Sequence, residues 1–373
     1  MENPMSFEDS NLANLGSIYE KALRMQRAES EPEWKKIKKE PGIYIWRIEK
    51  FSLIPWPEES YGTFYQGDTY IILSIKKKDD SLIYTAHEWV GQDSSCDESG
   101  TAAYKIVELD DYFNREITLI YEEQGFESLI FLSYFKNLNI LLGGIETGFK
   151  KVPIEKYNPK LLHVCGIGKC IQTTEIPFEK DSINDEDVFI FDMGLRIINW
   201  RGSKSNNFEK FHGSSVCQKI KSDRNGKPII EEVEEGEKQD EIDKLFLDER
   251  IKKRNKKINL KSRNPRFKMS LGLPKDMEKG CVKKMKELFD VDEKLEIKDV
   301  EFNKDNLKSN GCFLIDRGDV LFIWVGKDSN FSGKRFGVAF ARKYQNEEKR
   351  NRHLPIIEVR EGQLQDEIDE CFK

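Results

Sequence analysis

The chain has 373 residues, which is enough for two or three domains at roughly 100–200 residues each. It carries 61 lysines and arginines against 67 aspartates and glutamates, and this net charge of −6 argues against a dedicated nucleic-acid-binding protein. With 38% hydrophobic and 11% aromatic residues, the composition is that of a folded protein and excludes wholesale disorder.

The sequence has no apolar run long enough to cross a bilayer, and its first ten residues lack the pattern of a signal peptide. Its seven cysteines are an odd number, widely scattered, and without a CxxC pair. We therefore expect a soluble cytoplasmic protein, with no transmembrane segment, whose cysteines are reduced.

Residues 1–39 are expected to form an N-terminal arm. Within it, Leu12, Leu15, Tyr19 and Ala22 fall at helical spacing. Docking onto a neighbouring domain and fraying at the terminus are both consistent with this pattern.

A unit of about 120 residues then occurs three times. Strand-like runs begin at Asp68, Asp187 and Gly311, and each is followed by a second strand ending in Trp-x-Gly and then by a helical segment. The alternation of period-2 and period-3.6 patterns predicts an α+β fold, in which a long and a short helix pack on the faces of a central mixed sheet. The three tandem domains are predicted over residues 40–150, 155–247 and 281–373.

The helix predicted over residues 97–114 is apolar on more than one side. At about 100° per residue, its core-facing side is formed by Ala102, Ile106, Leu109 and Phe113. The opposite side gathers Tyr104, Val107, Glu108 and Asp111. An aromatic residue and a valine beside two acids make this side a candidate partner-binding surface, although isolated exposed apolar residues are common.

Paired carboxylates recur in the first two units, as Asp68 with Glu98 and as Asp187 with Glu209. In each pair, one acid opens a strand and the other begins the helix that packs on that sheet. Oxygen ligands from two elements suit calcium, whereas acids in a first helical turn can also serve only the helix dipole. The third unit has glycines at the equivalent positions, and we expect no calcium there.

A basic linker is predicted over residues 248–280. Within it, residues 251–268 carry nine lysines or arginines and no acid. A solvated connector is one interpretation, and attraction to an acidic protein surface or to anionic phospholipid is the other. A nuclear localisation signal is a weaker alternative.

Signatures of catalysis are missing. The four histidines stand far apart, and the sequence contains neither HExxH nor GxSxG nor a phosphate-binding glycine loop. We therefore expect a protein that is not an enzyme and assign no catalytic residue.

Several segments of the first unit resemble the gelsolin superfamily. They are Pro41–Phe51, Tyr61–Gly62, Gly67–Tyr70, Asp97–Ala103, Leu109–Tyr112, Gln124–Ser128 and Gly143–Phe149. With three units and Asn14–Ser17 in the arm, the chain is most similar to the three-domain, severin- and fragmin-like members. The resemblance implies a calcium-regulated protein of the actin cytoskeleton that severs actin filaments and caps their barbed ends.

The resemblance also implies which residues bind calcium. The first domain would use Asp68, Glu98 and the carbonyls of Gly67 and Ile145, with a second ion, shared with actin, at Asp110. The second domain would use Asp187, Glu209 and the carbonyl of Glu186.

Actin, as monomer and filament, is the implied partner. The side formed by Tyr104, Val107, Glu108 and Asp111 coincides with the family's actin-docking helix, and Lys210 and Lys221 match positions that grip the filament side. Two alternatives remain open. One is a barbed-end capping or monomer-binding protein without severing, and the other is a calcium-responsive adaptor for anionic membranes acting through residues 251–268.

Overall fold

The structure is a computed structural model. It describes residues 25–79, 81–144, 157–166, 171–248, 250–251, 283–291, 294–329, 333–351 and 353–372. No helix within these ranges is both long and apolar enough to cross a membrane.

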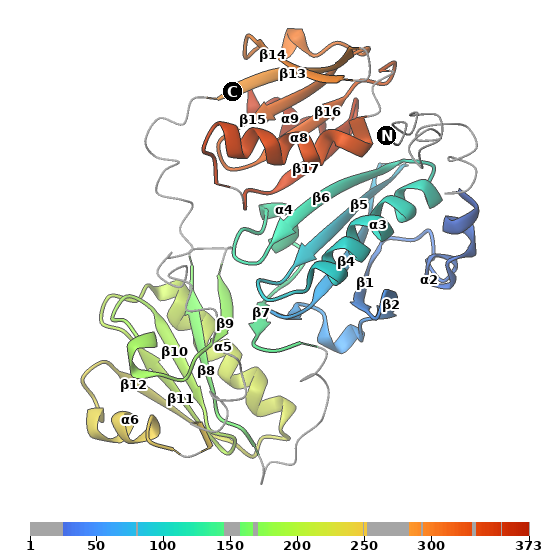
Figure 1. Ribbon diagram of the computed structural model, residues 1–373. Helices are drawn as coiled ribbons and strands as arrows, with labels where there is room; N and C mark the ends of the chain where they lie inside the picture. Colours follow the sequence, from blue (N-terminus) through green and yellow to red (C-terminus); the bar gives the residue numbers. More distant parts are fainter. Residues whose placement is uncertain are drawn as a thin grey trace, which may run out of the picture.

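Strands from all three repeats form two sheets (Figure 1). The larger sheet contains β1 (Gly42–Glu49), β2 (Ser52–Pro55), β4 (Thr69–Lys78), β5 (Ser81–Val90), β6 (Ile117–Glu123), β13 (Lys284–Val291), β14 (Lys294–Val300), β15 (Cys312–Asp316), β16 (Leu321–Val325) and β17 (Ile356–Arg360). Its strand order is β14-β13-β15-β16-β17-β6-β5-β4-β1-β2.

The smaller sheet has seven strands. These are β3 (Thr63–Tyr65), β7 (Leu138–Leu141), β8 (Lys160–Cys165), β9 (Gln172–Ile176), β10 (Val188–Asp192), β11 (Arg196–Arg201) and β12 (Ile229–Glu234). Its order is β12-β11-β10-β8-β9-β7-β3. The α-helices that lie wholly within the described residues are α2 (Pro32–Lys35), α3 (Cys96–Tyr112), α4 (Leu129–Leu132), α5 (Asn207–Asp223), α6 (Gln239–Leu245), α8 (Gly333–Glu347) and α9 (Gln365–Cys371).

The three repeats share one topology. Their core strands lie in the orders β6-β5-β4-β1, β12-β11-β10-β8 and β17-β16-β15-β13. In each, the last strand joins its neighbour in parallel after a long helix has crossed the sheet, as a parallel connection requires. The prediction of three repeats with an α+β fold is therefore confirmed.

The helix α3 packs as its period predicts. Ala102, Ile106 and Leu109 are fully buried, and Phe113 is 3% exposed. The same core continues into the third repeat, because Phe340, Ala341 and Tyr344 of α8 belong to the same hydrophobic cluster. The helices α3 and α8 thus lie on one face of the ten-stranded sheet (Figure 1).

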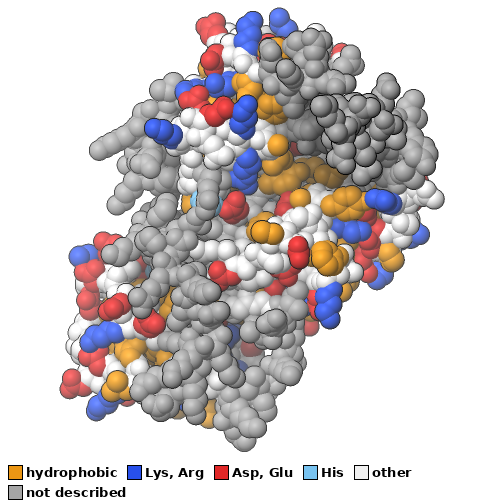
Figure 2. All heavy atoms as spheres, in the orientation of Figure 1, with side chains coloured by type: hydrophobic (Ala, Val, Ile, Leu, Met, Phe, Trp, Pro, Cys, Tyr) orange, Lys and Arg blue, Asp and Glu red, His pale blue; other side chains and the backbone are white. Residues whose placement is uncertain are grey.

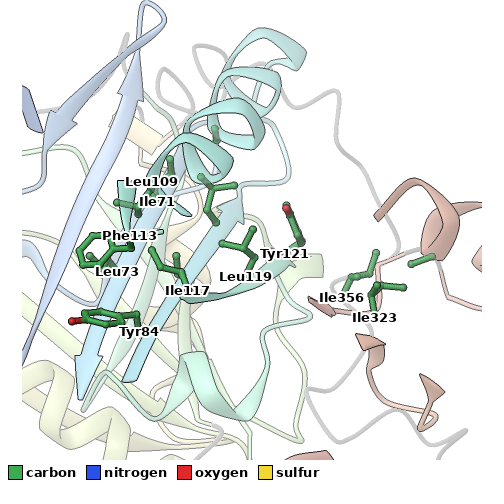
Figure 3. Packing of buried hydrophobic residues seen from close by; sticks show 14 of the residues in the cluster. Ile71, Leu73, Tyr84, Leu109, Phe113, Ile117, Leu119, Tyr121, Ile323 and Ile356 are labelled. Carbon is green, nitrogen blue, oxygen red and sulfur yellow. The ribbon is translucent and has the colours of Figure 1, made fainter. Parts of the chain in front are cut away.

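Repeats 1 and 3 are joined at a seam. There, β17 pairs antiparallel with β6 through Ile356, Ile357 and Glu358. Figure 3 shows Ile323 and Ile356 of repeat 3 in the same packed cluster as Leu119 and Tyr121 of repeat 1. Repeat 1 also contributes to the other sheet, where its strand β7 pairs in parallel with β9 of repeat 2.

Candidate metal sites and the surface of α3

A capping box fixes the start of α3 and with it the position of Glu98. Ser95 Oγ accepts a hydrogen bond from the Glu98 amide at 3.2 Å, and the Glu98 carboxylate accepts one from the Ser95 amide at 3.0 Å. Ser-x-x-Glu is the sequence that makes this reciprocal pair. The carboxylate is thereby held at the N-terminus of the helix, beside the sheet.

In the first predicted pair, Glu98 is linked by hydrogen bonds to Thr69, the residue that follows Asp68 in the sequence. Thr69 Oγ1 lies 2.5 Å from Ser94 Oγ, which donates to Glu98 Oε2 at 3.3 Å. Asp68 is fully buried, and its Oδ2 accepts from the hydroxyl of Tyr70 at 3.1 Å. Arg47 Nη1 stands 3.5 Å from the same oxygen.

Main-chain atoms approach Asp68 closely. The Gly67 amide donates to the Gly143 carbonyl at 2.6 Å, and a Cβ added to Gly144 would lie only 2.6 Å from Asp68 Oδ1. The Asp68 carboxylate thus lies against partly buried glycine backbone, and a hard cation such as calcium takes both carboxylate and main-chain carbonyl oxygens. Ile145, the other predicted ligand here, lies outside the described residues.

In the second pair, Asp187 immediately precedes β10 and Glu209 lies in the first turn of α5. His163 Nε2 lies 2.8 Å from Asp187 Oδ2, and the Glu209 carboxylate accepts from the amides of Gly166 at 3.1 Å and Asn206 at 3.0 Å. Burial raises the pKa of Glu209, and the negative charge of Asp187 raises it further. Two acids that repel each other in a partly buried site are suited to a cation.

Side chains alone do not complete either site. Across the described ranges, no three His, Cys, Asp or Glu side chains are grouped so as to hold a metal. Each pair would need main-chain carbonyl or solvent oxygens as further ligands, and calcium accepts such a mixed set whereas structural zinc does not. The residues therefore fit calcium. Glu186, whose carbonyl was predicted as a ligand, is exposed next to Asp187.

The C-terminal end of α3 faces repeat 3. Asp110 and Asp111 are 2% and 4% exposed, and Asp111 Oδ1 accepts from Arg115 Nε at 3.1 Å. Burial lowers the pKa of Arg360 on β17, and this lowering is opposed most strongly by the charge of Asp110. The guanidinium of Arg360 is thus within electrostatic reach of the residue predicted to hold the ion shared with actin.

The outer side of α3 is less exposed than its period predicts. Tyr104 is 43% exposed, but Val107 is half-buried and Glu108 is only 5% exposed. Helical period does not detect this burial, because other parts of the chain cause it. Trp34 Nε1 donates to Glu108 Oε1 at 3.0 Å, and repeat 3 lies beside Asp110 and Asp111.

The long helix of repeat 2 carries the predicted filament-side lysines. Lys210 and Lys221 are half-buried on α5, and their spacing of eleven residues puts them about 20° apart around the helix. Phe208 and Phe211, at 56% and 79% exposed, also lie on α5 and were not predicted. Figure 2 shows acidic and basic side chains interspersed over repeat 2 on the face drawn there.

Sequence reasoning missed three further residues at these sites. Arg47 belongs to the motif Pro41–Phe51 and could have been noted as the cation nearest Asp68, whereas the contacts of His163 and Trp34 depend on packing between distant segments. Of the predicted basic stretch 251–268, only Ile251 is described, and it is buried in the core of repeat 2.

A family model and several known proteins match the three repeats of this chain. The model of the gelsolin repeat matches residues 50–132, 170–242 and 295–368. The chain is 36% identical to gelsolin-like protein 1 of Lumbricus terrestris, covering 96% of this chain and 94% of that protein. It is 32% identical to severin of Echinococcus granulosus, over 96% of this chain and 95% of that protein.

Two further similarities are less extensive. Gelsolin of Gallus gallus is 32% identical over 84% of this chain and 40% of that protein. The crystal structure of the Thorarchaeota 2DGel3/rabbit actin complex covers 54% of this chain and 98% of that chain, at 26% identity and a TM-score of 0.23.

Proposed function

The chain belongs to the gelsolin family, and from that premise we propose that it is a calcium-regulated actin-binding protein of the cytoplasm. It severs actin filaments and then caps their barbed ends. The observation that carries the proposal is an α3 helix that presents the exposed Tyr104 on its outer side, in the first of three gelsolin repeats. An amphipathic helix that places apolar anchors in a groove is a recurrent mode of protein recognition.

We assign calcium to the two carboxylate pairs. In repeat 1, Asp68, Glu98 and the carbonyls of Gly67 and Ile145 bind one ion, and Asp110 binds a second ion together with actin. In repeat 2, the ligands are Asp187, Glu209 and the carbonyl of Glu186. Calcium supplies positive charge that offsets the repulsion between the acids of each pair.

Regulation follows from the position of repeat 3. Strand β17 pairs with β6, and its Arg360 interacts electrostatically with Asp110 and Asp111 at the end of α3. For these acids to meet actin, repeat 3 must move away. Calcium favours that open arrangement only to the extent that it binds the open form more tightly than the closed one.

Repeat 2 supplies the second contact. Lys210 and Lys221 on α5 hold the side of the filament, while α3 displaces a contact between actin subunits. Binding energy performs this work, and the mechanism assigns no catalytic residue and no nucleotide hydrolysis.

The test is microscopy of single labelled filaments, with calcium and with a chelator. We expect breaks with calcium and few with the chelator. Tyr104→Asp should lower the breakage rate at least tenfold, because a charge replaces the apolar anchor and anchors in a central groove carry most of the binding energy. The control is Leu195→Asp, which places the same charge on an exposed leucine of repeat 2.

The outcomes separate the alternatives. Filaments that stop growing without breaking would identify a capping protein and overturn severing. Unchanged severing by Tyr104→Asp would remove α3 as the docking surface. Binding to phosphatidylserine vesicles without any binding to actin would instead favour the membrane adaptor.

A further inference from the structure

The described part of the N-terminal arm lies along the outer side of α3. Residues 25–30 are helical, and α2 follows at once. Arg27 Nη1 donates to the hydroxyl of Tyr104 at 3.1 Å, and Lys105 Nζ is 2.5 Å from Glu31 Oε2. The side chains that the arm contacts therefore include the main exposed residue of the proposed actin-docking surface.

The arm is fixed to repeat 1 at its C-terminal end. Trp34 is fully buried and packs edge-on against Trp46, with ring centroids 5.1 Å apart. Its indole nitrogen donates to Glu108, and Glu33 Oε2 accepts from Trp46 Nε1 at 3.3 Å. This anchor keeps the preceding residues close to α3, so their contacts form at high local concentration.

The N-terminal end of the arm is held more weakly. Arg27 is exposed, and the ion pair between Glu31 and Lys105 reaches the surface, with each side chain 15% exposed. Ala28 is the buried residue of this turn. The exposed hydrogen bond between Arg27 and Tyr104 contributes little, whereas the partly buried ion pair between Glu31 and Lys105 is the stronger contact, which a partner must replace in order to displace the segment.

We infer that residues 25–31 are a built-in competitor for the α3 surface, which must leave Tyr104 and Lys105 before actin can dock. This inference rests on the proposed function. When a binding surface is covered for most of the time, the apparent affinity for the partner equals the intrinsic affinity multiplied by the fraction of molecules in which the surface is uncovered. The arm would thus set the threshold for actin binding independently of repeat 3.

The test compares the full-length chain with Glu31→Lys in binding to monomeric actin with calcium. The substitution turns the ion pair with Lys105 into a repulsion, and we expect binding about fivefold tighter. Glu29→Lys is the matched control, since it makes the same charge change two residues away on an exposed position and should leave affinity unchanged. Removal of residues 1–30, which retains Trp34, should reproduce the gain.

Amide hydrogen exchange gives a readout that does not depend on affinity. In the free protein, Glu31→Lys should speed exchange in residues 25–31, and adding actin to the unaltered chain should do the same. Slower exchange of residues 25–31 in the complex would show that the arm forms part of the interface and would overturn the inference. Weaker actin binding by Glu31→Lys and by the chain without residues 1–30 would do the same. Equal actin affinities of the unaltered chain, Glu31→Lys and the chain without residues 1–30 would also overturn the inference. Actin binding by the unaltered chain would still leave the proposed function intact.

Discussion

Glu98 and Glu209 occupy equivalent positions and serve two purposes. Each is the third residue of a long helix and accepts a hydrogen bond from the backbone of the N-cap residue. Each also lies near the acid that opens the neighbouring strand. A carboxylate can therefore be kept in place by the fold before any ion arrives, which reduces the ordering required when calcium binds.

Charge removal separates the two purposes. Glu98→Gln retains a side-chain acceptor for the Ser95 amide but loses the negative charge. Asp68→Asn likewise removes the negative charge of Asp68 and retains a side-chain oxygen. We expect either change to raise the calcium concentration for half-maximal severing by about tenfold, because ligand charge tunes calcium affinity. Asp97→Asn, at the exposed neighbouring position, is the control. An unchanged calcium requirement in both variants would refute the assignment.

The sequence predicts the burial of single residues where the local helical pattern determines it. The core side of α3 was predicted from its period, and Ala102, Ile106 and Leu109 are indeed buried. The burial of Glu108 and Asp111 could not be predicted in this way. Lys105 and Arg115 of the same segment contact these two acids, but Trp34 of the arm and Arg360 of repeat 3, which also interact with them, are far away in the sequence.

At the scale of elements, the capping boxes explain why helices begin where the candidate ligands lie. Asn206 caps α5 through the Glu209 amide, and its side-chain nitrogen donates to the Gly166 carbonyl at 3.1 Å. One residue thus connects the start of α5 to the end of β8. The helix and the strand that carry the second candidate site are held together by this contact.

Loss of this cap should be measurable. Asn206→Ala removes both hydrogen bonds, and we expect the free energy of unfolding to fall by about 1–2 kcal/mol in a denaturant titration. Asn207→Ala, at the first and exposed position of the helix, should change it by less than about 0.5 kcal/mol. Equal losses in the two variants would show that the cap is not what stabilises this helix end.

At the scale of the whole molecule, the seam between repeats 1 and 3 contains buried acids. Arg342 lies 3.3 Å from Glu123, whose other oxygen contacts His353. Burial raises the pKa of Glu88 to about 8, Arg342 lowers it, and Glu123 raises it. The folded state thus favours the protonated form of this carboxyl group on β5.

This raised pKa gives stability a pH dependence of known sign. In the unfolded chain the carboxyl titrates near 4.5, so the stabilising contribution is complete below that pH and is lost as the pH rises through about 8. Glu88→Gln, which stays neutral, should raise the thermal midpoint by about 2–4 °C at pH 8.5 and by less at pH 6. The control is Glu58→Gln at an exposed position. An equal effect at both pH values would contradict this prediction.

The repeats were predictable from the sequence, but the joins between them were not. The alternation of strand and helix patterns and the recurring Trp-x-Gly gave three units of one topology. The pairing of β17 with β6, and of β7 with β9, links edges of separate units. Edge strands present the same unpaired backbone groups to any partner, so periodicity does not specify which edge is chosen.

The pairing of β7 with β9 affects what happens when the chain is cleaved. The strand β7 belongs to repeat 1 in the sequence, yet it covers the side of β9 in the sheet of repeat 2. A polypeptide cleaved between these repeats and then separated would leave both halves with a newly bare backbone edge. Such halves would tend to self-associate in solution, and a nick at this position need not release them from each other.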